Sequence, residues 1–101
     1  MNRIERIQAM EALLDECTGA VTEFEAALAR YRAAQPAIQK LSRYYGSRIW
    51  YADRRADESG RLPQDLRRGV LSEDLIYDVI TGNRDNALEM LETSTDIMRK
   101  L

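Results

Sequence analysis

The sequence has no histidine and only one cysteine among its 101 residues. The absence of histidine removes the most common general base, the usual catalytic triads and most zinc sites. The single cysteine, Cys17, cannot form a disulfide within the chain, so nothing demands an oxidising compartment. Cys17 follows Glu16 and has no basic neighbour in sequence, and we expect a buried, unreactive thiol.

Long apolar runs and phosphate-binding loops are also missing. No apolar run approaches the roughly 18 residues that a membrane-spanning helix needs. The N-terminal segment carries acidic residues early and has no apolar core, unlike a signal peptide. Gly60 and Gly69 are isolated and match no nucleotide-binding motif. We therefore expect a cytoplasmic protein with no cofactor and no membrane association.

Carboxylates are the remaining catalytic groups. Glu89 and Glu92 have the Glu-x-x-Glu spacing of all-helical nucleotide pyrophosphatases, but the Glu-x-x-Asp that completes their metal site does not follow. Asp74 and Asp78 lie one helical turn apart, a spacing that suits one hard cation. Because Asp74 is also explained by helix capping, a metal enzyme is the last of our three hypotheses, and we do not predict an enzyme.

The formal net charge of −2 conceals a strong pattern along the chain. Residues 1–29, 30–68 and 69–101 carry net charges of −4, +6 and −4. A basic middle segment could attract an anion or a nucleic acid. We favour the alternative that the acidic segments fold back on the basic one, because a chain with a pI near 5.2 lacks the basic surface of most nucleic-acid binders.

The first third of the chain has an unbroken heptad pattern of apolar residues at alternating spacings of three and four. These residues are Ile7, Met10, Leu14, Cys17, Val21, Phe24, Leu28 and Tyr31. The pattern predicts a helix over about residues 3–33 with Cys17 on its buried face. Leu13 and three alanines widen the face, which suits packing against two neighbours in a bundle.

Pro36 predicts a bend at residues 34–36, followed by a second helix that contains Gly46. The apolar positions of this helix are Ile38, Leu41, Tyr45, Ile49 and Ala52. A polar turn over residues 57–63 precedes a short helical turn over 64–68, which Gly69 would end.

Ser72 has the features of an N-cap for a C-terminal helix. The predicted buried residues of that helix are Leu75, Ile76, Val79 and Ile80. Gly82 either ends this helix or lies within it. The predicted fold is therefore all-α: one domain, residues 1–101, forming a small antiparallel helical bundle.

The unusual residues of the chain gather in its middle segment. The candidate binding patch consists of Tyr44, Arg48, Trp50, Tyr51, Asp53 and Arg54. Such a mixture of aromatic and basic side chains can stack on bases and pair with phosphates. The same residues can be structural, since tryptophan in a small bundle is usually a core anchor and arginine packs on aromatic faces. We favour the structural interpretation.

Several short motifs of the sequence resemble those of a family of small bacterial proteins known only as a domain of unknown function. They are Tyr44-Tyr45-Gly46-Ser47 with Trp50 and Asp53, Gly60-Arg61-Leu62-Pro63, and Gly69-Val70-Leu71-Ser72-Glu73-Asp74. The resemblance extends from the first helix to about Leu91. It implies a stand-alone bacterial cytoplasmic helical protein and assigns no activity, ligand or site residue.

Two functional hypotheses rank above the metal enzyme. The wide heptad face favours a non-enzymatic helical module that binds a protein partner or a second copy of itself. The alternative is an anion or nucleic-acid binder centred on Trp50.

Overall fold

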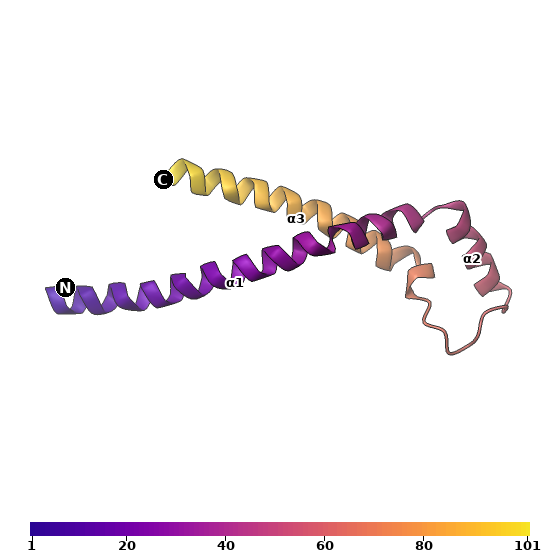
Figure 1. Cartoon of the computed structure of the whole chain (residues 1–101), viewed down its shortest axis with the longest axis horizontal. Coiled ribbons are helices and arrows are strands. Elements are labelled where there is room, and N and C mark those ends of the chain that lie inside the picture. The colour runs from indigo at the N-terminus through magenta and orange to yellow at the C-terminus, as the bar shows by residue number, and fades with distance from the viewer. The chain divides into compact units, whose positions relative to one another are not determined.

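The computed structural model describes residues 1–101 and contains helices and no strand, which confirms the predicted all-α fold class (Figure 1). The elements are α1 (Arg3–Tyr44), α2 (Arg48–Glu58), the 3₁₀ helix η1 (Gly69–Leu71) and α3 (Glu73–Lys100). None of the helices combines the length and the hydropathy needed to cross a membrane. The chain divides into two compact units, residues 1–35 and residues 36–101.

The first unit contains only the part of α1 up to Gln35. Asn2 begins the helix, because its side-chain oxygen accepts a hydrogen bond from the backbone N–H of Glu5 (2.8 Å) and its amide donates to the Glu5 carboxylate (2.9 Å). A single helix has no second element within the unit against which to bury an apolar face, and no residue of α1 is buried. Cys17 is exposed, so the predicted buried thiol is wrong.

The predicted bend at residues 34–36 is also wrong, since α1 continues through Pro36 to Tyr44. A proline inside a helix removes one backbone donor, here the one that would pair with the carbonyl four residues earlier. Alanines precede and follow the ring at residues 33, 34 and 37, and these small, strongly helix-forming residues favour continuation on both sides.

Gly46, not Pro36, ends the first helix. Its φ of +75° lies in the left-handed region, which glycine adopts without steric cost. Ser47 then caps α2 by accepting a hydrogen bond from the backbone N–H of Trp50 (3.2 Å). This break shifts the helical phase, and Ile49, predicted to be buried, is 67% exposed.

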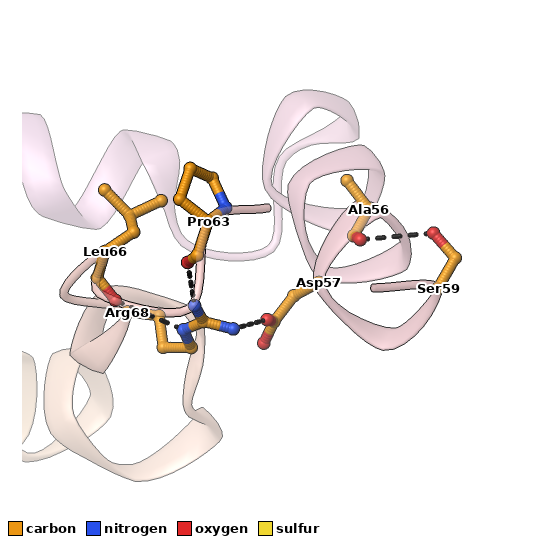
Figure 2. A network of polar contacts seen from close by, with 6 residues as sticks. All are labelled: Ala56, Asp57, Ser59, Pro63, Leu66 and Arg68. Atoms are coloured by element: carbon orange, nitrogen blue, oxygen red, sulfur yellow. Dashed lines mark hydrogen bonds and ion pairs between the residues drawn. The ribbon is translucent and has the colours of Figure 1, made fainter. Parts of the chain in front are cut away.

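Arg68 organises the turn between α2 and η1 (Figure 2). Its guanidinium pairs with the carboxylate of Asp57 and donates to the backbone carbonyls of Pro63 and Leu66. The predicted helical turn over 64–68 is wrong: the segment has one turn hydrogen bond, from Leu66 N to Pro63 O (3.2 Å), and the 3₁₀ helix follows it. The guanidinium takes up two carbonyls there and so replaces helical hydrogen bonds.

The third helix begins as the sequence predicts. Ser72 accepts from the backbone N–H of Leu75 (3.3 Å), with two acidic residues in the first turn. Gly82 lies inside the helix and does not end it. Of the four residues predicted to be buried, only Ile76 is; Leu75 and Val79 are exposed and Ile80 is half-buried.

Candidate functional site

Trp50 is the centre of the core of the second unit. The side chain is 3% exposed, and the other two buried residues are Leu71 in η1 and Ile76 in α3. Its indole N–H donates a hydrogen bond to the backbone carbonyl of Val70 (2.9 Å), which satisfies the one polar atom of the ring. The ring therefore joins α2 to the segment that precedes α3.

Two tyrosines surround the indole. The ring centroids of Tyr45 and Tyr51 each lie 5.0 Å from that of Trp50, at interplanar angles of 60° and 74°. These tilted geometries match the arrangement that aromatic pairs prefer. Tyr45 also donates its hydroxyl hydrogen bond to the backbone carbonyl of Glu73 (3.0 Å), so it connects the end of α1 to the first turn of α3.

Arg54 lies over the ring of Trp50. Its guanidinium carbon lies 4.9 Å from the centroid of the Trp50 ring, within the range of a cation–π interaction. The same guanidinium pairs with the carboxylate of Glu73 at 3.0 Å. Arg54 thus already has both an aromatic face and a carboxylate as partners.

Tyr44 and Asp53 form a second, separate pair. The Tyr44 hydroxyl donates a hydrogen bond of 2.6 Å to the Asp53 carboxylate, and both residues are half-buried. Burial, followed by this hydrogen bond and the negative charge of Asp53, raises the pKa of Tyr44 from 10.0 to about 12. The partner of Asp53 is therefore a tyrosine and not one of the neighbouring arginines.

This pair forms one wall of an open pocket of about 240 Å³. The remaining lining residues are Leu62, Leu66, Arg67, Val70 and Leu71. Four of the lining residues are aliphatic, and the polar groups are the Tyr44–Asp53 pair and the Arg67 guanidinium.

The predicted patch is thus divided by the structure. Trp50, Tyr51 and Arg54 belong to the aromatic cluster, Tyr44 and Asp53 line the pocket, and Arg48 is exposed on α2. The sequence reasoning missed the partners of this cluster: Val70 accepts from Trp50, and Glu73 accepts from Tyr45 and Arg54. The signal was present in the Gly69–Asp74 segment, an apolar pair directly before a helix cap.

The carboxylates do not assemble a metal site. No group of three or more cysteine, aspartate or glutamate side chains is placed to hold a metal ion. Asp74 lies in the first turn of α3, where its charge faces the positive end of the helix dipole, and the structure brings no third ligand to it and Asp78.

Fold and site together define an all-helical protein whose most distinctive residues build a small aromatic core. The chain belongs to the family described as Domain of unknown function (DUF4298), whose model matches residues 7–93. This match confirms the family resemblance indicated by the motifs between Tyr44 and Asp74. No curated protein and no solved structure matches the chain.

The raised pKa of Tyr44 predicts a distinctive alkaline titration. Tyrosinate absorbance should show one of the five tyrosines ionising near pH 12, and Asp53→Asn should lower that pKa towards 10 because the neighbouring charge is gone. A folded-state pKa above the unfolded value means that this stabilisation is complete below pH 10 and is lost between pH 10 and 12. Tyr44→Phe should remove the late step, and five tyrosines titrating together in the folded wild type would contradict the assignment.

Proposed function

We propose that the protein is a non-enzymatic helical interaction module, which pairs through the heptad face of α1 with a helix of a protein partner or of a second copy. The heptad face is defined here as the a and d positions from Ile7 to Tyr31. The observation that carries the proposal is that residues 1–35 form a unit of one helix with an unbroken apolar stripe and no buried residue. Helices of this type gain stability by pairing such a stripe with another helix.

The exposure of the stripe supports this role. Ile7, Met10, Leu14, Val21 and Phe24 are each 53% to 58% exposed. Burying large aliphatic and aromatic side chains of this kind contributes about 1.5–3 kcal/mol each. A contiguous row of them is typical of surfaces that bind another molecule.

The alternative from the sequence, an anion or nucleic-acid binder centred on Trp50, has less support. Base stacking needs an accessible aromatic face, whereas Trp50 is buried and Arg54 already pairs with Glu73. Arg48 and Tyr51 are the exposed members of the candidate patch, whereas its central aromatic residue, Trp50, is 3% exposed. We therefore place the function on α1.

Site-specific photo-crosslinking in cells tests the proposal. A photoreactive residue at position 14, a heptad a position, should give an adduct with a second polypeptide, and its mass distinguishes a second copy from another protein. The matched control is position 12, where Ala12 lies on the opposite face of the same helix. Adducts in equal yield at both positions, or a crosslink from position 14 only within the same chain, would overturn the proposal.

A further inference from the structure

The charges of α1 are distributed unevenly around and along the helix. Residues 7–29 contain five acidic residues and no lysine or arginine. The acidic residues are Glu11, Asp15, Glu16, Glu23 and Glu25. This span includes the exposed part of the heptad face. All the charged side chains of this span are therefore negative.

Two of the five acidic side chains lie beside the stripe, whereas Asp15, Glu16 and Glu23 occupy the solvent-facing b and c positions. With Ile7 at position a, Glu11 and Glu25 occupy e positions, which border the apolar seam and contact the partner helix in a coiled coil. The f positions on the opposite face are Ala12, Gly19 and Ala26, all small and uncharged. The charged residues that border the seam within this span are therefore both glutamates.

A second copy is a poor electrostatic match for this span. When residues 7–29 pair with the same span of a second copy, Glu11 and Glu25 meet no positive charge, because the e and g positions of the span contain no lysine or arginine. Opposite charges across the e and g positions of a coiled coil help to determine which helices pair. Self-association through this span therefore gains no interhelical ion pair.

We propose that the partner is a basic amphipathic helix, with aliphatic residues at its own a and d positions and lysine or arginine at the flanking positions. The inference rests on the proposed function and specifies the partner of the same face. Apolar residues at the seam provide contact area, and the acidic border selects the charge of the partner.

Binding of designed peptides to the full chain tests the inference by fluorescence anisotropy. The probe is a labelled peptide of about four heptads with leucine at a and d and lysine at e and g, and the control peptide has glutamate in place of every lysine. The basic peptide should bind, the acidic peptide should bind at least about tenfold more weakly, and raising NaCl from about 50 mM to about 500 mM should weaken the basic complex.

A matched pair of protein variants tests where the charge acts. The double variant Glu11→Gln/Glu25→Gln should weaken binding of the basic peptide about five- to thirtyfold, as expected for two partly screened ion pairs. Glu89→Gln/Glu92→Gln removes the same charge from α3 and should leave binding unchanged. Equal losses in both double variants would mean that only net charge matters and would overturn the inference.

The outcomes separate this inference from the proposed function. Equal, salt-independent binding of both peptides would overturn the basic-helix inference and leave a helix-binding face in place. No peptide binding, with a second-copy adduct at position 14, would also overturn it in favour of self-association. No peptide binding and no adduct would overturn both.

Discussion

Replacing Trp50 with alanine should lower the free energy of unfolding by about 3–5 kcal/mol, the range for truncating a buried aromatic side chain. The substitution removes the centre of a three-residue core and the contacts of the two tyrosine rings. It also removes the indole donor of the Val70 carbonyl. A loss of this size is a large fraction of the 5–15 kcal/mol by which domains are typically stable, and urea unfolding followed by far-ultraviolet circular dichroism measures it.

Two further variants identify the origin of the loss. Trp50→Phe keeps most of the ring but removes the N–H, so its cost should be smaller, about 1–3 kcal/mol for an acceptor left without its donor. Tyr51→Ala removes a ring of similar chemistry that is exposed on α2, and it should cost the least of the three. If Trp50→Ala and Tyr51→Ala proved equally stable, Trp50 would not be the core anchor.

Local signals in the sequence predicted the helical class and several helix ends. Ser72 fulfils its predicted role because an N-cap depends on its own side chain and on a backbone N–H three residues away. The persistence of α3 through Gly82 and of α1 through Pro36 shows the limit of such signals. A helix-breaking residue has a cost of about 1 kcal/mol for glycine and 3 kcal/mol for proline, which favourable neighbours on both sides can exceed.

Burial was predicted less well than secondary structure. The apolar pattern of α1 predicts a face, but the first unit contains no second element to cover it, so Cys17 and its neighbours are exposed. In α2 the left-handed Gly46 restarts the helix with a new phase, which moves Ile49 outwards and Trp50 inwards. Periodicity identifies which residues share a face, whereas the partner of that face depends on contacts distant in sequence.

The site shows the same division between local and distant information. The composition of the Tyr44–Arg54 segment identified an unusual cluster, and the structural interpretation of its tryptophan agrees with its burial. The partners of that cluster, the Val70 carbonyl and the Glu73 carboxylate, lie about twenty residues away, and no spacing rule links them to α2. The charge pattern along the sequence did predict one such contact, because the ion pair of Arg54 and Glu73 joins the basic middle segment to the acidic C-terminal segment.

Ile76 provides the second large effect, because it is 2% exposed and closes the core from the side of α3. Ile76→Ala should lower the free energy of unfolding by about 2–5 kcal/mol, the range for truncating a buried aliphatic side chain to alanine. Leu75→Ala is the matched control: it deletes a side chain of the same size from the adjacent position of the same helix, where 56% of the residue is exposed, and should cost less than about 1 kcal/mol. Alanine has a higher helix propensity than leucine or isoleucine, so neither substitution weakens the helix through propensity. A larger loss for Ile76→Ala in urea unfolding therefore reports on packing. Equal losses would show that the two faces of α3 at this turn are buried alike, and would refute the placement of the core on the Ile76 side.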